Sequence, residues 1–278
     1  MRAHVLRRVM NAIIFRILLW LAVLATLFPI LWMILSSFKP PDIVQAIPPI
    51  WSFTPTLRNY NDVLTGSTSM TALVVHSAIV AALATVLTLA AALPAAYALA
   101  RIRFRGKHAL ASWILSTIMF PPVVSAIPVF IVVGQLGLMD TYPALVIPYT
   151  AFNLPVIIWL LRSFVRQVPQ EIEEAALIDG SSHVGVVRRI VLPLAAPGLA
   201  AAAILSFLFS WNEFLFALTL TRSAVKTAPV GVSQFTGMYG TQWGDLTAAS
   251  TVIAAPVLIM TLILRRRIVQ GLTFGAVK

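Results

Sequence analysis

Long apolar stretches alternate along the chain with short segments that carry nearly all of its charge. Each stretch has the roughly 20 residues that a helix needs to cross the hydrocarbon core of a bilayer. The first contains no charged residue between Arg16 and Lys39. We therefore predict an all-α membrane protein with six transmembrane helices, over Ile17–Ser37, Leu73–Ala100, Ala109–Val133, Tyr142–Leu161, Leu199–Thr221 and Leu246–Leu264.

Composition and charge support this prediction and orient the helices. Of the 278 residues, 59% are hydrophobic and 10% are charged, against about 25% charged in a soluble domain. The net charge is +11, and sixteen of the twenty Lys and Arg residues lie before the first predicted helix, after the last, or in the second and fourth loops. Basic residues gather on the cytoplasmic side, so both termini are expected there. The positive charge thus does not indicate nucleic-acid binding.

The predicted spans divide the chain into a first helix and a larger core. The apolar run after the basic N-terminus exceeds the 7–15 residues of a signal peptide, so we interpret it as a retained signal-anchor helix. We expect a cytoplasmic tail over 1–16, a helix with an external Pro-rich loop over 17–71, a core over 72–264 and a cytoplasmic tail over 265–278. Within the core, Pro121, Pro122 and Pro128 predict either a static kink or a gating hinge.

A polar insert interrupts the apolar pattern between the fourth and fifth spans, in a predicted cytoplasmic loop over 162–198. Pro169 fits the first turn of a short helix, where its missing N–H costs nothing. Gly180 fits the left-handed residue that ends such a helix. Three glutamates crowd the first turn, where the helix dipole and solvent explain them without catalysis: Glu171, Glu173 and Glu174.

A second short helix is predicted to follow directly. Ser181 or Ser182 can cap its start, and we expect it to end at the basic pair 188–189. The alanine pair Ala175–Ala176 gives the first helix a small-residue face that another protein surface can approach closely. The insert therefore predicts a two-helix elbow that packs against another protein, rather than a plain solvated connector.

The spacing within this insert resembles the signature loop of the membrane subunits of binding-protein-dependent ABC importers, the EAA motif. That loop reads Glu-Ala-Ala, three residues, Gly, nine residues, then Ile-x-Leu-Pro. The resemblance implies a coupling helix that docks on a cytoplasmic ATPase subunit and switches the membrane helices between inward- and outward-facing states. It assigns this coupling role to Glu174, Ala175, Ala176, Asp179, Gly180, Ile190, Leu192 and Pro193.

Other segments resemble the carbohydrate-uptake branch of this family, and specifically its maltose-type inner permease: Phe152–Pro169, Phe209–Thr221 and Arg265–Lys278, which ends in Gly-Ala-Val-Lys. The resemblance implies a type I ABC importer transmembrane domain in a bacterial cytoplasmic membrane. Its implied partners are membrane lipid, a homologous second permease, a cytoplasmic ATPase dimer, an extracytoplasmic solute-binding protein and a sugar. In this family the C-terminal tail also reaches the ATPase interface.

The chain lacks the groups that nucleotide or metal chemistry needs. The single Gly-Lys pair, Gly106–Lys107, has no upstream glycine at the P-loop distance and is followed by His108. The four histidines are scattered without metal-ligand spacing, and the chain has no cysteine. We expect no catalytic residue, metal or cofactor in this chain, with ATP and Mg on partner subunits.

Glu213 is the acid that lies well inside a predicted span, and such a carboxylate normally faces a cavity or a partner. Together with Trp211 and Asn212 it forms a polar and aromatic patch suited to a sugar in the translocation pathway. A structural contact with the partner permease, or a gate, explains the same patch equally well. Asn153 and Gln234 are weaker candidates for the pathway.

Three other functions compete with a sugar importer. A stand-alone ion-coupled secondary transporter usually has several buried charges, and one glutamate is thin support for it. A structural membrane scaffold leaves the signature loop unexplained. An importer for a polyol or glycerol-phosphate substrate stays open, because the membrane subunits of such importers look alike.

Overall fold

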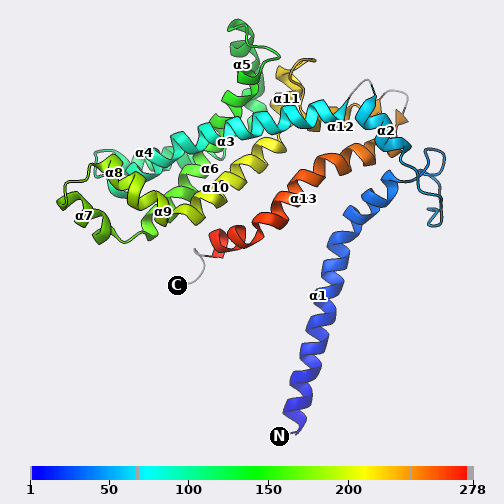
Figure 1. Ribbon diagram of the computed structural model, residues 1–278, viewed down its shortest axis with the longest axis horizontal. Coiled ribbons are helices and arrows are strands. Elements are labelled where there is room, and N and C mark those ends of the chain that lie inside the picture. Colours follow the sequence, from blue (N-terminus) through cyan, green and yellow to red (C-terminus); the bar gives the residue numbers. More distant parts are fainter. Residues whose placement is uncertain (1, 67–68, 238–239, 274–278) are drawn as a thin grey trace. The chain divides into compact units, whose positions relative to one another are not determined.

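The computed structural model describes residues 2–66, 69–237 and 240–273, and the chain divides into two units (Figure 1). The first unit comprises residues 1–70 and 232–254, and the second comprises 71–231 and 255–278. The last helix, α13 (Trp243–Thr273), contributes to both. Residues 274–278, which end the predicted C-terminal tail, lie outside the described residues, as do 238–239.

The first unit begins with one long apolar helix. This helix, α1 (Arg2–Ser37), starts well before the predicted Ile17. Its segment Ile13–Ser37 is long and apolar enough to cross a membrane, and within the chain its most apolar window has no buried residue. A helix that is apolar all round suits a lipid or protein environment. After it come α2 (Arg58–Thr65) and a hairpin of β1 (Thr236–Gly237) with β2 (Gly240–Thr241).

Three long helices form the core of the second unit. Alanines on α3 (Met70–Arg101) and α10 (Ala196–Trp211) share one apolar cluster with Ile157 and Leu161 of α6 (Tyr142–Gln167). Small residues let helix backbones approach closely. At Gly198 the approach is extreme, because a Cβ there would overlap the ring of Phe164. Figure 1 shows the three helices running alongside one another.

The third predicted span is not one helix. The helices α4 (Lys107–Thr117) and α5 (Pro122–Gln135) meet at an angle of 93°. Pro121 is extended and Pro122 takes the first helical position. A proline disfavours helical backbone in the residue before it, and neither proline donates an N–H. The span predicted over Ala109–Val133 is therefore two helices with a sharp bend at the prolines, a stronger interruption than the predicted kink within one helix.

The fifth predicted span, Leu199–Thr221, is also interrupted. After α10 the chain breaks at Asn212–Phe214 and resumes in α11 (Leu215–Leu220), followed by α12 (Ala228–Ser233). Before α10, the segment His183–Leu194 meets it at 82°. Among the described residues, four helices are long and apolar enough to cross a membrane, or six if each bent pair counts as one span. The all-helical character is confirmed except for the small hairpin.

Candidate functional site

The polar insert folds as the predicted elbow. Its first helix is α7 (Gln170–Ile178), and Gly180 follows with a left-handed φ of 85°. Ser182 then caps the next helix, because its Oγ accepts the Gly185 N–H at 3.2 Å. Pro169 lies one position before the first helical residue rather than inside the first turn.

The second arm of the elbow is longer than predicted. It does not end at the basic pair 188–189, because α8 (His183–Val186) continues as the π-helical turn η1 (Val187–Val191) and then as α9 (Leu192–Leu194). Wide turns of this kind inside helices are frequent at functional sites. The spaced residues Ile190, Leu192 and Pro193 therefore lie in one helical arm.

The inner face of the elbow packs on the ends of α3 and α6. Val186 and Val191 of the second arm are fully buried in a cluster with Tyr97 and Val165. Ala176 and Leu177 of the first arm pack against the same cluster. Both arms are thus held by apolar burial to the two core helices that precede them.

A buried ion pair fixes α7 more firmly. Glu173 is 3% exposed, and its carboxylate lies 2.8 Å from the Arg101 guanidinium and accepts the Tyr97 hydroxyl at 3.1 Å. Arg101 also donates to the carbonyls of Val165 and Val168 at the end of α6. The prediction that solvent and the helix dipole account for Glu173 is wrong, because this carboxylate is buried and paired.

The outer face of the elbow presents apolar side chains to its surroundings. Ile178 is 86% exposed and Val184 is 76% exposed. Ala175 is exposed while Ala176 is half-buried, so the two alanines do not share one outward face. Exposed apolar residues on a polar segment mark an interaction surface. Around them, Glu174, Asp179, Gly180 and Pro193 are exposed, and Ile190 and Leu192 are half-buried.

A second carboxylate organises the opposite end of the second unit, and sequence reasoning missed it. Asp140, at a left-handed φ of 60°, accepts hydrogen bonds of 2.9–3.2 Å from the backbone N–H groups of Arg222, Ser223, Ala224 and Val225. Burial alone would raise its pKa, but the four donors together outweigh this and hold the pKa well below its usual range. Asp140 therefore stays ionised and joins the α5–α6 turn to the segment after α11.

The patch Trp211–Glu213 lies in the break between α10 and α11. Trp211 is buried and stacks on Phe207, whereas Asn212 is exposed and donates to the Leu208 carbonyl. Glu213 is half-buried and caps α11 by accepting the N–H groups of Phe216 and Ala217 at 2.9 and 3.2 Å. The carboxylate thus has a structural task, and its contact with a substrate stays a prediction.

Asn153 occupies a buried position on α6. Its side-chain amide donates to the hydroxyl of Ser210 at 2.9 Å and to the carbonyl and hydroxyl of Ser206 at 3.3 and 3.4 Å. These bonds join α6 to α10 inside the core. A role of Asn153 in the translocation pathway stays a prediction.

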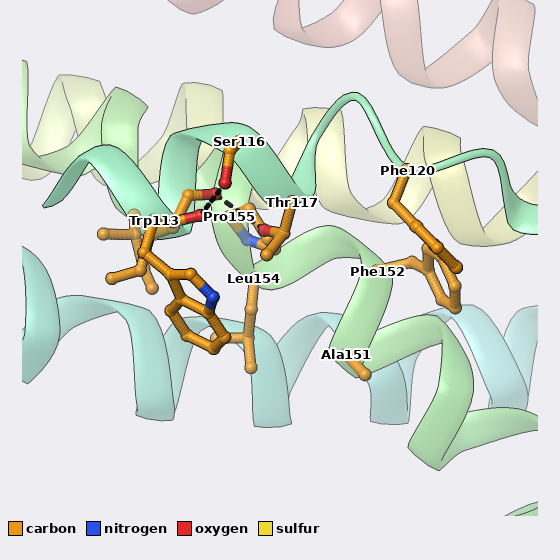
Figure 2. A pocket seen from close by; sticks show the side chains of 10 residues that line it. Trp113, Ser116, Thr117, Phe120, Ala151, Phe152, Leu154 and Pro155 are labelled. Carbon is orange, nitrogen blue, oxygen red and sulfur yellow. Dashed lines mark hydrogen bonds between the residues drawn. The ribbon is translucent and has the colours of Figure 1, made fainter. Parts of the chain in front are cut away.

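A cavity of about 590 Å³ opens between α4 and α6, next to the bend at Pro121. Figure 2 shows Trp113, Phe120 and Phe152 around it. The hydroxyls of Ser116 and Thr117 donate back to carbonyls of their own helix at 2.7 Å, as the dashed lines show. The lining is therefore apolar in character, which favours an acyl chain or an apolar side chain over a sugar.

Comparison with known proteins decides the family. Residues 92–273, which include the elbow, match the family described as binding-protein-dependent transport system inner membrane component. The chain belongs to this family. The match confirms the resemblance that the EAA spacing indicated, and it makes the chain a membrane component of a transport system.

Relatives along the whole chain support the same family. The trehalose/maltose transport system permease protein MalG of Thermococcus litoralis is 39% identical, over 100% of this chain and 99% of that protein. The trehalose transport system permease protein SugB of Mycobacterium tuberculosis is 41% identical, over 91% and 92%. The sulfoquinovosyl glycerol transport system permease protein SmoH of Agrobacterium fabrum is 36% identical, over 91% and 89%.

A solved structure shares the fold. It is a chain of a bacterial ABC transporter involved in the import of the acidic polysaccharide alginate, with a TM-score of 0.77 and 23% identity. The similarity covers 92% of this chain and 96% of that one. The chain thus shares its overall fold with a chain of that transporter.

Proposed function

We propose that the chain is a non-catalytic permease subunit of an ABC importer for a carbohydrate. It forms half of the translocation pathway beside a homologous second permease. A cytoplasmic ATPase dimer supplies the energy, with ATP and Mg bound there, and an extracytoplasmic solute-binding protein delivers the sugar. The names of the family relatives support this proposal, since they cover trehalose, maltose and a glycerol-linked sugar. The proposal therefore names carbohydrates as a class rather than one sugar.

The observation that carries the proposal is the elbow with its two opposite faces. One face is locked to α3 and α6 through Glu173, Arg101 and the valine cluster. The other face exposes Ile178 and Val184, which need a partner surface. A rigid element with a docking face can carry a push from an ATPase into the core helices. We place this elbow and both termini in the cytoplasm, following the distribution of basic residues.

Single-cysteine crosslinking tests the docking and the orientation together. The chain has no cysteine of its own, so Ala175→Cys gives one reactive thiol on the exposed side of α7. It should crosslink to the ATPase subunit in the assembled complex. Ser52→Cys, on an exposed loop of the other predicted side, is the matched control and should not. If only Ser52→Cys crosslinked to the ATPase subunit, the predicted orientation would be reversed and the docking proposal would be wrong.

Reconstitution tests the activity. The purified chain alone should hydrolyse no ATP, and the complex with its partner subunits should do so when a sugar-loaded binding protein is added. Ile178→Asp should reduce ATPase binding, because it places a charge in the docking face. Ile102→Asp, at a half-exposed apolar position beyond α3, is the control. Sugar uptake by the chain alone, driven by an ion gradient, would overturn the proposal in favour of a secondary carrier.

A further inference from the structure

A polar pocket of about 280 Å³ lies within the first unit, and its lining includes no residue of the elbow and not Glu213. The loop after α1, the helix α2 and the start of α13 form its walls. The lining of this pocket differs from that of the apolar cavity in Figure 2. It combines carboxylates, amides, a guanidinium and an indole. The polar and aromatic members are Gln45, Arg58, Asp62, Gln242, Trp243 and Asp245.

Asn59 and Gly244 build the inner part of this pocket. The Asn59 amide donates to the carbonyls of Ser37 and Lys39, both at 2.8 Å, and so pins α2 to the end of α1. A Cβ at Gly244 would lie 2.7 Å from the Asn59 Oδ1, so only glycine permits this close approach. Asn59 is 0% exposed, and its Oδ1 has no hydrogen-bond partner among the described residues. A buried acceptor without a partner is costly.

Charges of both signs line the pocket, with two carboxylates against one guanidinium and a formal sum of −1. Arg58 Nε lies 3.5 Å from Asp62 Oδ2, and Asp245 lines the same pocket. A cation would meet the guanidinium, and an anion would meet two carboxylates. A neutral ligand with many hydroxyls suits the pocket better, because each hydroxyl both donates and accepts. The carboxylates accept, and Arg58 donates.

We propose that this pocket binds one or two rings of a carbohydrate, as a subsite separate from the core of the second unit. The choice of carbohydrate rests on the proposed function, whereas the polar and aromatic lining stands on its own. The half-exposed indole of Trp243 supplies the apolar surface against which the ring of a sugar packs. The volume lies near the lower end of the range for small-molecule sites, about 300–1,000 Å³. On the predicted topology the pocket faces the extracytoplasmic side, where a sugar is delivered.

Sugar binding to the assembled transporter, without the solute-binding protein, tests the proposal. Saturation-transfer NMR with trehalose and with maltose measures the dissociation constant. Trp243→Ala and Asp245→Asn should each weaken binding by about tenfold or more, equivalent to about 1.4 kcal/mol. Asp62→Asn, which keeps the side-chain shape, should act in the same direction and covers the case in which Trp243→Ala fails to fold.

Matched controls come from the same unit. Trp51→Ala removes an exposed indole outside the pocket, and Asp42→Asn removes an exposed carboxylate outside it; both should bind as wild type. Unchanged binding in the three pocket variants would overturn the proposal, as would absence of sugar binding to the wild type. Binding of calcium ions instead of sugars, lost in the carboxylate variants, would also overturn it.

Uptake into proteoliposomes separates this proposal from the proposed function. The full system with its binding protein is assayed with the same two sugars and then with a wider set of carbohydrates. If the wild type takes up sugar and the pocket variants bind it unchanged, the pocket proposal is contradicted and the importer proposal stands. If the full system takes up no carbohydrate, the proposed importer function is contradicted. Sugar binding that depends on Trp243 would still support the proposed binding site.

Discussion

Asp140 and Glu173 both tie a loop of the second unit to a distant part of the chain, and they use different partners. Asp140 accepts four hydrogen bonds from backbone N–H groups of residues 222–225. Glu173 accepts from two side chains, the guanidinium of Arg101 and the hydroxyl of Tyr97. One carboxylate is therefore held by dipoles within a loop, and the other by a charge on another helix.

This difference bears on how each end of the unit moves. Backbone donors are part of the loop they stabilise, so the Asp140 contact persists only while that loop keeps its shape. Side-chain donors on α3 hold α7 as a separate helix, so we expect α7 and the end of α3 to move together. We infer that the Asp140 end is a fixed staple and that the Glu173 end transmits motion from the elbow to the core.

Glu173→Ala should have the largest effect on stability. It leaves the Arg101 guanidinium buried without its carboxylate, and breaking a buried pair in this way costs about 3–5 kcal/mol. Thermal unfolding of the purified chain in detergent measures the loss. Glu171→Ala, at an exposed position of the same helix, is the control and should change stability little. If Glu171→Ala destabilised the chain as much as Glu173→Ala, the ion pair with Arg101 would not account for the loss.

The double variant Arg101→Met with Glu173→Met sharpens the comparison. Replacing a buried pair by apolar residues of similar volume is often neutral for stability, so the double variant should recover most of the loss. The specific tie between α7 and α3 would still be gone. ATPase activity of the complex should then continue while sugar uptake per ATP falls. Full recovery of uptake would show that packing alone transmits the motion.

Asp140→Asn should have the next largest effect on stability. An asparagine keeps one accepting oxygen but turns an NH₂ group toward two of the four backbone donors. Arg222, Ser223 and Ala224 are exposed, so water can replace part of the lost acceptor, and we expect a total loss of about 1.5–3 kcal/mol in thermal unfolding, the contribution of one hydrogen bond to a charged group. Asp179→Asn, on the exposed side of the elbow, is the control. Because the staple is local, coupling of ATPase to uptake should not change in the variants that fold.

The Asp140 staple also predicts a pH dependence. The pKa of this carboxyl is lower in the folded chain than its ordinary value of 3.8. Its contribution to the free energy of unfolding is therefore complete above pH 3.8. It is lost as pH falls through the lower folded pKa. The stability difference between wild type and Asp140→Asn should be constant near neutral pH and shrink below pH 3.8. A difference that narrows between pH 7 and 5 would contradict this assignment.

Sequence reasoning succeeded at Gly180 and Ser182 and did not find the partners of the two carboxylates. Gly180 and Ser182 take their predicted roles because a left-handed helix end and a cap depend on neighbours a few residues away. The partners of Glu173 and of Asp140 were missed because they lie 72–76 and 82–85 residues away. A pattern of apolar and polar positions carries no information about such pairs.

The breaks in two predicted spans have a related cause. Apolar composition continues across Pro121 and across the segment 212–214, so a search for long apolar stretches joins what the backbone separates. At Pro121 the signal was present, since two consecutive prolines cannot both continue a helix. At Glu213 the signal was the carboxylate itself, which caps a new helix start. Both features were noted in the sequence as a kink and a buried acid.

Tyr97→Phe should have the smallest effect and gives the finest test of the comparison. It removes a neutral donor from Glu173 and leaves the ion pair with Arg101 intact, so the cost should lie at about 1.5 kcal/mol, the lower end for a hydrogen bond to a charged group. Tyr142→Phe, in the same unit and with its ring packed against His76, is the control in thermal unfolding. If Tyr97→Phe cost as much as Glu173→Ala, the hydroxyl rather than the guanidinium would hold α7. The Glu173 carboxylate would then be held by a neutral donor, as Asp140 is, and the two ends of the unit would no longer differ in kind.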